Sequence, residues 1–507
     1  MLFIDSVIPA HHDAVTSYVN FMKPLVNACL LLSFLSLPAL GDANFNHLFS
    51  SIKPPHSHTA IIATNLVTGD IIFEQNPDTL LLPASTMKLL TAVAATSALG
   101  PRFRFTTGVY STTPIKDGVI GGDVYIRFSG DPTLTENDLK SLLNQLRDLG
   151  LNKIQGNLYL VGQANEQLKA PGWVWDDLGI CYAAPVSNFV LNKNCVHGKL
   201  SPKLASVQSL LSVPNDLPIS IKNTSVFDKS GIDDFCQLDL QRFPANHFSL
   251  SGCYSGSHAI KLAIAITDPG LFMQESLKGI FKSSKIRLQG KISVTHKLPT
   301  QVHLIAAHQS SPLADLLHTM LIHSDNLIAD SLLKQLGKNL FHRPGNFTNG
   351  SRALKDILTG EGIILTHAQI VDGSGLSRYN LLSASQLSQV LHLIYTDPRF
   401  RDLMDSLPVA GVSGTLKYKS GFNKPPLHKH VMAKTGSMQG VNNLAGFIRS
   451  DTQDDTLFVI LENGQSPLDK KQQQLPFSAL FLHTLMDNSL AKHIQTGPTL
   501  DTSFQAN

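Results

Sequence analysis

The sequence predicts a mixed α/β protein of the α+β type, in which a helix-rich part is divided by a long β-rich segment. Apolar residues with helical spacing occur near the start of the chain and again in its second half. Short β-like runs separated by Gly, Pro, Asp and Asn fill the region between them. The chain has 507 residues, more than one hydrophobic core usually supports, so two or three domains are expected.

The predicted elements divide the chain into three parts. Residues 42–100 contain two strands and, after Pro83-Ala84, a helix: Thr59–Thr64, Asp70–Glu74 and Ser85–Leu99. Residues 101–299 are expected to form one or two inserted, mainly β domains with runs such as Val124–Phe128, Leu158–Val161 and Ile260–Ile266. Residues 300–507 return to helices, then three strands and a closing helix: Leu313–Ile322, Asn326–Leu336, Ser383–Tyr395, Val431–Thr435, Asn443–Ile448, Leu457–Leu461 and Phe477–Leu490. The first and third parts are expected to form one domain.

Composition argues against some classes of protein. Hydrophobic residues make up 43% of the chain and charged residues 16%, which is typical of a compact globular protein. The formal net charge is only +3, and no basic stripe with interleaved aromatic residues is present. We therefore expect no nucleic-acid partner, whereas contact with an anionic wall or membrane surface is permitted.

Residues 1–41 have the pattern of a leader that ends in a signal peptide. Met22-Lys23 precedes the apolar run Leu25–Leu37, which is too short for a comfortable membrane span and is followed by small residues at 39–41. We therefore expect export to the periplasm, with at most peripheral membrane association. The start codon, at Met1 or Met22, stays open.

Loss of that leader would remove Cys29 and leave four cysteines: Cys181, Cys195, Cys236 and Cys253. Four cysteines allow three pairings. The short spacings within the first two and within the last two favour sequential bridges, each worth about 3 kcal/mol in the chain-entropy model. Zinc binding is the alternative, but no Cys-x-x-Cys pair supports it.

Three short strings contain residue types suited to nucleophilic catalysis. The first, Ser85-Thr-Met-Lys88, opens the first long predicted helix. A serine hydroxyl is a weak nucleophile at neutral pH and needs a nearby base, and the i and i+3 spacing places the Lys88 amine beside Ser85. A lysine acts as a base only when its pKa falls, which burial and a neighbouring cation promote. Lys434 is the candidate cation.

The Ser-x-x-Lys spacing alone carries little information. It also occurs at Ser50/Lys53 and Ser331/Lys334, where we interpret it as a frayed leader and one face of a helix. We therefore expect Ser50 and Ser331 to remain unmodified by reagents that acylate Ser85.

The second string, Ser324-Asp325-Asn326, lies between two predicted helices. Ser324 would bring a second hydroxyl that relays a proton to the leaving amine. Asn326 can donate to a substrate carbonyl and accept from Lys88, using both halves of its amide. For this string alone a plainer interpretation stays open, namely that Ser324 and Asp325 only cap the next helix.

The third string, Lys434-Thr435-Gly436, lies on a late predicted strand. Lys434 and Thr435 offer a charge and a hydroxyl suited to the terminal carboxylate of a substrate. Gly436 leaves room for a ligand to lie against the strand. The backbone amides of Ser437 and Ser85 would form an oxyanion hole.

In this order, the three strings resemble those of the class C low-molecular-mass penicillin-binding proteins, the penicillin-binding protein 4-like D-alanyl-D-alanine carboxypeptidase/endopeptidases. The resemblance includes five further strings: Ser129–Thr135, Gly172–Asp177, Asp372–Arg378, Gly411–Leu416 and Gly440–Gly446. It implies a penicillin-binding-protein/β-lactamase-like transpeptidase domain, with a five-stranded antiparallel sheet between helices and inserted β-rich domains. The long segment between Ser85 and Ser324 agrees with such insertions.

The resemblance also implies an activity. It is that of a serine-type D-Ala-D-Ala carboxypeptidase and DD-endopeptidase, which cleaves peptidoglycan stem peptides and cross-links, is acylated by β-lactams and needs no cofactor. A subsite for the side chain of meso-diaminopimelate is implied at Asp177, Tyr182, Arg378 and Gln439. There, Arg378 would pair with the carboxylate and Asp177 with the ammonium, and Tyr182 would pack between them. The pairs Cys181–Cys195 and Cys236–Cys253 are implied too, and a homo-oligomer stays open.

Three other functions fit parts of the sequence. A β-lactamase shares the acylation step, but the inserted segment argues against it, and turnover of nitrocefin would identify it. A non-catalytic wall-binding protein predicts a damaged set of motifs, whereas all three strings are intact. A metal site at His428-x-His430 lacks a third ligand nearby in the sequence.

Overall fold

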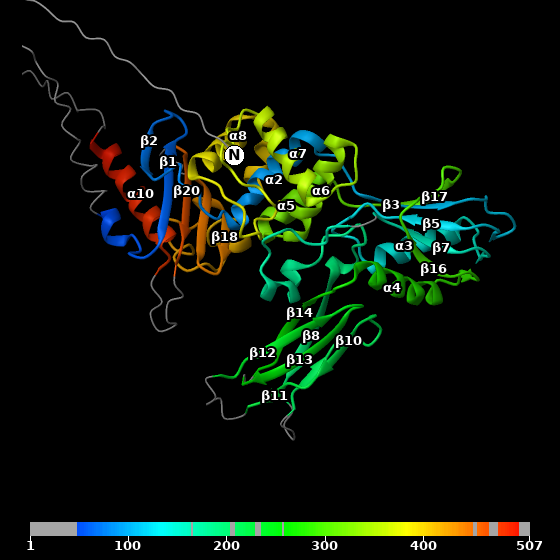
Figure 1. Cartoon of the computed structure of the whole chain (residues 1–507). Helices are drawn as coiled ribbons and strands as arrows, with labels where there is room; N and C mark the ends of the chain where they lie inside the picture. Colours follow the sequence, from blue (N-terminus) through cyan, green and yellow to red (C-terminus); the bar gives the residue numbers. More distant parts are fainter. Residues whose placement is uncertain are drawn as a thin grey trace, which may run out of the picture.

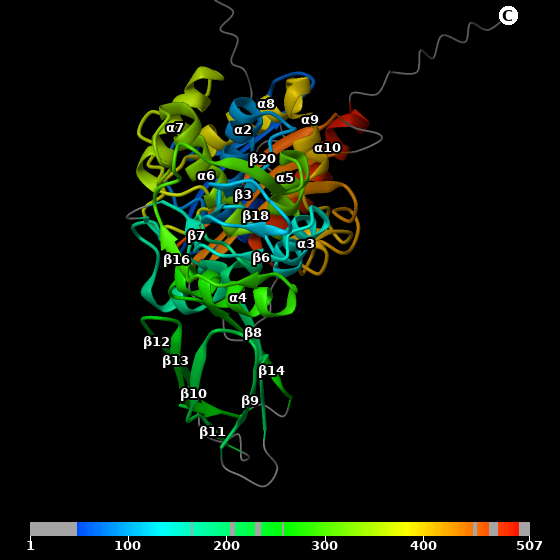
Figure 2. The same ribbon diagram turned by 90° about the vertical axis from the view of Figure 1, so that its right-hand side faces the viewer.

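The computed structural model describes residues 48–163, 166–202, 208–228, 235–255, 258–449, 454–465 and 475–495, with side chains described up to residue 487. The predicted leader and signal peptide, including Met22 and Cys29, lie outside the described residues. Figures 1 and 2 show a large helix-rich part, a smaller part beside it and an elongated β arm.

The large part is built on a five-stranded antiparallel sheet, here called the first sheet, with the order β18-β19-β20-β1-β2. Its strands are β1 His58–Asn65, β2 Ile71–Gln75, β18 Val431–Met438, β19 Val441–Ile448 and β20 Thr456–Asn463. Strands from the two ends of the chain therefore pair side by side, as β1 does with β20. The five-stranded antiparallel sheet that the resemblance implies is confirmed.

Helices cover both faces of the first sheet (Figure 1). One face packs against α2 Met87–Leu99, α5 Leu313–His323, α6 Asn326–Phe341, α7 Phe347–Gly360, α8 Ala384–Thr396 and α9 Arg401–Asp405. The opposite face packs against α10 Phe477–Gln495. Along β20, Val459 joins the first core and Phe458 the second, as the alternation of a strand requires. Residues Met87 to Ala95 of α2 are all buried, so this helix lies inside the core.

The smaller part contains a second sheet, with parallel and antiparallel strands in the order β16-β7-β5-β3-β17. Its strands are β3 Thr106–Ser111, β5 Val124–Arg127, β7 Leu158–Val161, β16 Ile292–Thr295 and β17 His303–Gln309. This part also contains a short parallel sheet, which consists of β4 Val119–Ile120, β6 Lys153–Ile154 and β15 Arg287–Leu288. Two helices, α3 Glu136–Asp148 and α4 Pro269–Ser283, share its core.

Two details of the inserted segment differ from the prediction. The second sheet extends past residue 299, where the segment was expected to end, because β17 pairs with β3. The segment is also less purely β than expected, because α3 and α4 are amphipathic helices that supply much of its core.

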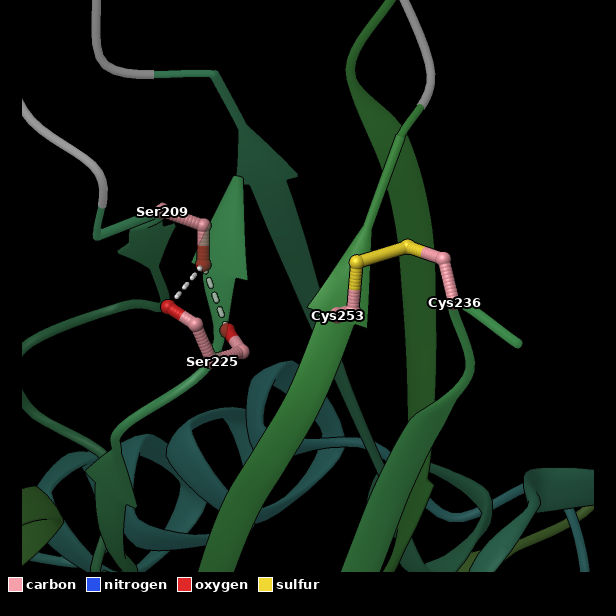
Figure 3. The surroundings of a disulfide bond; sticks show 4 residues. All are labelled: Ser209, Ser225, Cys236 and Cys253. Atoms are coloured by element: carbon pink, nitrogen blue, oxygen red, sulfur yellow. Dashed lines mark hydrogen bonds between the residues drawn. A yellow bond between two sulfur atoms is a disulfide. The ribbon is translucent and has the colours of Figure 1, made fainter. Parts of the chain in front are cut away.

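The β arm consists of β8 Cys195–Ser201, β9 Leu210–Ser212, β10 Ser220–Asn223, β11 Val226–Phe227, β12 Leu238–Phe243, β13 His247–Tyr254 and β14 Ile260–Ala265. Among the described residues of the arm, the core cluster is small, and its buried members are Leu200, Leu250 and Tyr254. The disulfide Cys236–Cys253 lies in this arm, across from the hydrogen-bonded pair Ser209 and Ser225 (Figure 3). A covalent bond supports such a thin core by restricting the unfolded chain.

The second disulfide, Cys181–Cys195, joins the 3-10 turn η3 Cys181–Ala183 to the first residue of β8. Both disulfides therefore have the sequential pairing that the sequence favoured.

Candidate active site

Ser85 lies in a short 3-10 turn, η1 Ala84–Thr86, and not in the first turn of the helix as predicted. The preceding Ala84 has a φ of +46°, a left-handed conformation that costs energy for a residue with a side chain. Gly375 approaches this turn so closely that a Cβ at that position would clash with the carbonyl oxygen of Ala84. The chain thus holds Ser85 in a sharp turn between α2 and the loop around residue 375.

Lys88, in the first turn of α2, is the centre of the hydrogen bonds around Ser85. Its Nζ lies 2.9 Å from Ser85 Oγ and donates to Asn326 Oδ1 at 2.6 Å and to the carbonyl of Ser374 at 2.6 Å. The side chain is fully buried. Burial lowers the pKa of Lys88 to about 8, although nearby carboxylates, Asp330 first, act in the opposite direction.

The string Ser324-Asp325-Asn326 connects α5 to α6. Ser324 ends α5 with a φ of +58°, and the side chain of Asp325 caps α6 by accepting from the backbone N–H of Ile328 at 3.1 Å. Asn326 is the first residue of α6, and its Nδ2 donates to the carbonyl of Tyr182 at 2.9 Å. Asp325 therefore caps a helix, while Ser324 on one side of it faces Lys434 and Asn326 on the other side faces Lys88.

Lys434, on β18, links the third string to the second. Its Nζ donates to Ser324 Oγ at 2.8 Å, and the side chain is fully buried. Burial, and then the charge of Lys88, lowers the pKa of Lys434 well below its ordinary value. The two buried lysines thus lie close enough for the charge of Lys88 to favour the neutral form of Lys434.

The rest of β18 fits closely against η1. A Cβ at Gly436 would lie 2.7 Å from the carbonyl oxygen of Pro83, so glycine permits the approach of the strand to the Ser85 turn. Thr435 Oγ1 donates to Thr415 Oγ1 at 2.8 Å, within the predicted string Gly411–Leu416. Ser437 is exposed next to Gly436.

Sequence reasoning gave no role to two buried carboxyl groups behind Lys88. Asp330 Oδ1 accepts from the backbone N–H groups of Gly373 and Ser374, at 2.8 and 3.0 Å, and so fixes the loop whose carbonyl accepts from Lys88. Burial, and then the charge of Asp372, raises the pKa of Asp330 to about 8. Because Asp330 follows Asn326 by four residues on α6, helical spacing was a signal that could have found it.

The four residues of the predicted diaminopimelate subsite lie in two contacting pairs. Tyr182 donates from its hydroxyl to Asp177 Oδ1, and both guanidinium NH groups of Arg378 lie 3.3 Å from the carbonyl oxygen of Gln439. No hydrogen bond or ion pair joins Asp177 to Arg378 within the described residues. The segments that carry them are nevertheless docked together, since the backbone N–H of Arg378 donates to the carbonyl of Gly172 at 3.0 Å.

Trp173 holds the same two segments together. Its indole Nε1 donates to Asp372 Oδ2 at 2.9 Å, and Ser377 Oγ donates to the carbonyl of Pro171 at 2.6 Å. Asp372 in turn accepts from the backbone N–H of Gly375 at 2.8 Å. The loop that carries Arg378 is therefore also the loop that supports Ser85 and Lys88.

The described part of the chain bears on two alternatives, a metal site and a membrane helix. It contains no cluster of three or more His, Cys, Asp or Glu side chains suited to a metal ion. His430, one of the two histidines considered as ligands, has its Nδ1 2.9 Å from the carbonyl oxygen of Arg449. Within the same residues no helix has the length and hydropathy of a membrane span.

The chain matches proteins of known activity along most of its length. The sequence profile of the D-Ala-D-Ala carboxypeptidase 3 (S13) family matches residues 47–482. D-alanyl-D-alanine carboxypeptidase DacB of Haemophilus influenzae is 35% identical over 463 residues, which cover 90% of this chain and 96% of that protein. A D-alanyl-D-alanine carboxypeptidase of an Actinomadura species is 25% identical over 430 residues, 80% of this chain and 78% of that one.

Solved structures show the same relationship. The crystal structure of penicillin binding protein 4 (dacB) from Haemophilus influenzae matches with a TM-score of 0.81 and 34% identity, covering 89% of this chain and 99% of that one. Its complex with a novel β-lactam matches with a TM-score of 0.77 and 33% identity over the same shares. The fold and the family that the three strings predicted are thus confirmed, and the chain belongs to the D-Ala-D-Ala carboxypeptidase 3 (S13) family of serine peptidases.

Proposed function

We propose that this protein is a D-Ala-D-Ala carboxypeptidase and DD-endopeptidase that works through an acyl-enzyme on Ser85. The observation that carries the proposal is the position of the Lys88 amine, which is fully buried and lies within hydrogen-bond distance of both Ser85 Oγ and Asn326 Oδ1. A neutral amine in that position can remove the serine proton. Family membership gives the reaction class, and the site supplies the residues.

The acylation step follows from these contacts. Lys88 takes the proton of Ser85 as Oγ attacks the carbonyl of the penultimate D-alanine. The oxyanion that forms accepts from the backbone N–H groups of Ser85 and Ser437. Burial lowers the pKa of Lys88 to about 8, so an appreciable fraction of the amine is neutral near pH 7.

Collapse of the tetrahedral intermediate breaks the peptide bond, and the leaving amine needs a proton. We infer that Ser324 delivers it, and the hydrogen bond that its hydroxyl accepts from the buried Lys434 at 2.8 Å supports this role. The proton that Lys88 took from Ser85 returns through Ser324 to the leaving D-alanine. Water then attacks the acyl-serine, Lys88 again accepts a proton, and Ser85 is regenerated.

The third string would hold the end of the substrate. Lys434 and Thr435 offer N–H and O–H donors to the terminal carboxylate, and the extended substrate would lie along β18 beside Gly436. β-Lactams carry a carboxylate beside a strained amide, so the same groups should accept them. We propose them as covalent inhibitors of this chain.

The test is mass analysis of the purified protein after incubation with benzylpenicillin. We expect one adduct, on the peptide that contains Ser85, and we expect release of D-alanine from a soluble pentapeptide to stop as the adduct forms. Turnover of defined cross-linked muropeptides then separates endopeptidase from carboxypeptidase activity. An adduct on any other serine, or rapid hydrolysis of nitrocefin, would reject the proposal in favour of another nucleophile or of a β-lactamase.

We further propose that Asp177, Tyr182, Arg378 and Gln439 bind the side chain of meso-diaminopimelate. The two contacting pairs are carried by docked segments. Among the described residues, the guanidinium of Arg378 hydrogen-bonds only to a backbone carbonyl, so it can receive a carboxylate. Arg378→Ala should lower kcat/KM for diaminopimelate peptides about 10- to 100-fold, since a charged hydrogen bond contributes about 1.5–3 kcal/mol. Acylation by simple penicillins should change little. Equal losses with both compounds would show that Arg378 only supports the fold.

We also propose that the protein acts in the periplasm. Its two disulfides suit an oxidising compartment, and the family acts on the cell wall. Fractionation of cells, with the disulfides mapped by non-reducing peptide analysis, tests this, and a cytoplasmic protein with free thiols would contradict it.

A further inference from the structure

A cavity of about 860 Å³ lies between the second sheet and the C-terminal half of α6. None of the three catalytic strings lines it. Its walls come from the ends of β5 and β7, from residues 186–188 and from α6 with the turn that follows it. The volume is in the range of small-molecule sites, but most of the residues that line the cavity are polar or charged.

The cavity has more basic than acidic side chains in its wall: Arg127, Lys334, Lys338 and Arg343 against Glu166. Lys334 and Glu166 already have partners. Lys334 Nζ donates to the carbonyl of Val186 at 2.6 Å and lies 3.9 Å from Glu166 Oε1, and the Glu166 carboxylate accepts from Ser187 and Asn188 at 2.7 Å each. This pair therefore belongs to the wall itself.

The wall has three other cationic side chains, those of Arg127, Lys338 and Arg343. No ion pair or side-chain hydrogen bond connects any of them to another residue that the structure describes. Arg127 and Lys338 also line an adjoining cavity of about 240 Å³, and burial together with the charge of Arg127 lowers the pKa of Lys338. Like charges thus gather at one place, and no carboxylate of the described residues forms an ion pair with them.

Two further features of the wall are polar groups that the protein leaves available. Ser331 lines the cavity, and its buried hydroxyl has no hydrogen-bond partner among the described residues. His296 and His342 also line it, and their ring nitrogens add hydrogen-bonding groups. The wall therefore combines cationic side chains with neutral hydrogen-bonding groups.

We propose that this cavity binds an anionic ligand with two or more carboxylate or phosphate groups, held by Arg127, Lys338 and Arg343. A ligand of that kind supplies the charge that the wall lacks, and its size matches the cavity better than a single ion does. Both the carboxylates of wall peptides and phosphate groups have this chemistry. The cavity shares α6 with the active site, and Lys338 lies about 18 Å along the helix from Asn326.

The test is calorimetric titration of the full protein with two probes, inorganic pyrophosphate and a soluble disaccharide-tetrapeptide. The active site is first filled with benzylpenicillin, so that the peptide cannot bind there, and mass analysis verifies the adduct. We expect binding that weakens with added salt and that falls at least tenfold in the double variant Arg127→Gln/Lys338→Gln. Binding of one probe and not the other identifies the source as phosphate or as wall carboxylate.

The matched control is the double variant Lys199→Gln/Lys261→Gln, which removes two positive charges from exposed positions on β8 and β14 in the β arm. It should leave the affinity for both probes unchanged. Labelling of Ser85 by penicillin should be normal in every variant, which shows that each one is folded. If the Arg127→Gln/Lys338→Gln variant binds both probes as well as the wild type, or if the wild type binds neither, the anion site is refuted. Failure of penicillin to label the wild type would count against the proposed function and not against this cavity.

Discussion

Two Ser-x-x-Lys pairs in this chain share a spacing and differ in almost everything around it. In both, the lysine is buried, and burial lowers its pKa to about 8. Lys88 directs its amine to the Ser85 hydroxyl and to Asn326, whereas Lys334 donates to the backbone carbonyls of Gln167 and Val186. A lowered pKa is therefore not what makes a lysine a catalytic base here. The direction of its hydrogen bonds decides.

The serines differ in the same way. Ser85 lies in a turn before α2, next to β18, while Ser331 lies within α6 and its hydroxyl has no partner among the described residues. A nucleophile needs a base on one side and a place for the substrate on the other. Only the first pair is bordered by the other two strings.

The largest expected effect on activity comes from comparing the loss of the Ser85 hydroxyl with the loss of the Ser331 hydroxyl. Ser85→Ala should abolish penicillin labelling and lower peptidase activity about 10⁴-fold or more, because the nucleophile is lost. Ser331→Ala should leave both within about twofold of the wild type, since that hydroxyl contacts no catalytic group. Fluorescent penicillin on a gel and D-alanine release measure both. Residual labelling of the Ser85 variant would show that the two pairs had been assigned the wrong way round.

Replacing Lys88 and Lys334 one at a time separates an effect on the acylation rate from an effect on the stability of the fold. Lys88→Met should slow acylation about 10²- to 10⁴-fold, the usual contribution of a general base. Lys334→Met should acylate normally when folded but lose about 3–5 kcal/mol of stability, because Glu166 and two backbone carbonyls would be left buried without their partner. Stopped-flow acylation and thermal unfolding report the two effects. Normal acylation by Lys88→Met would remove Lys88 from the mechanism.

The smallest expected effect is a shift in the pH dependence of the acylation rate, which distinguishes Lys88 from Lys334 although their pKa values are similar. Protonated Lys88 cannot accept a proton, so the acylation rate should rise with pH, about tenfold per unit well below the pKa of about 8, and level off above it. Asp330→Asn should move this rise to lower pH, since the Asp330 carboxylate raises the pKa of Lys88. Lys334→Met should leave it in place. A rate that does not change between pH 6 and 9 would contradict a lysine base.

The strands and helices with strong local patterns were predictable. The predicted strand Val431–Thr435 lies within β18, and the predicted helix Asn326–Leu336 lies within α6. Helix α3 was missed although Leu139, Leu142, Leu143 and Leu146 have the spacing of a buried helix face. Strand β17 was assigned to the wrong side of the expected boundary, because nothing in its own residues reveals that it pairs with β3, far back in the sequence.

The candidate site shows the same division between local and distant information. The three strings were visible because each is short and carries its own chemistry. The sequence did not reveal that the Ser374 carbonyl accepts from Lys88, because this contact depends on a backbone group that Asp330 positions from another element. Likewise, the sequence offered Ser331/Lys334 as an equal to Ser85/Lys88 in spacing, and only the tertiary contacts separate them.

The Cys181–Cys195 disulfide connects the redox state of the compartment to the active site. Tyr182 follows Cys181 directly, and its carbonyl accepts from the same Asn326 amide that receives the Lys88 amine. The covalent bond thus anchors one neighbour of a catalytic asparagine. A reduced chain keeps all three strings but loses that anchor, so we expect oxidative folding to act as a maturation step. Under the proposed function, the peptidase would gain its full activity only where thiols are oxidised, which suits the proposed periplasmic location.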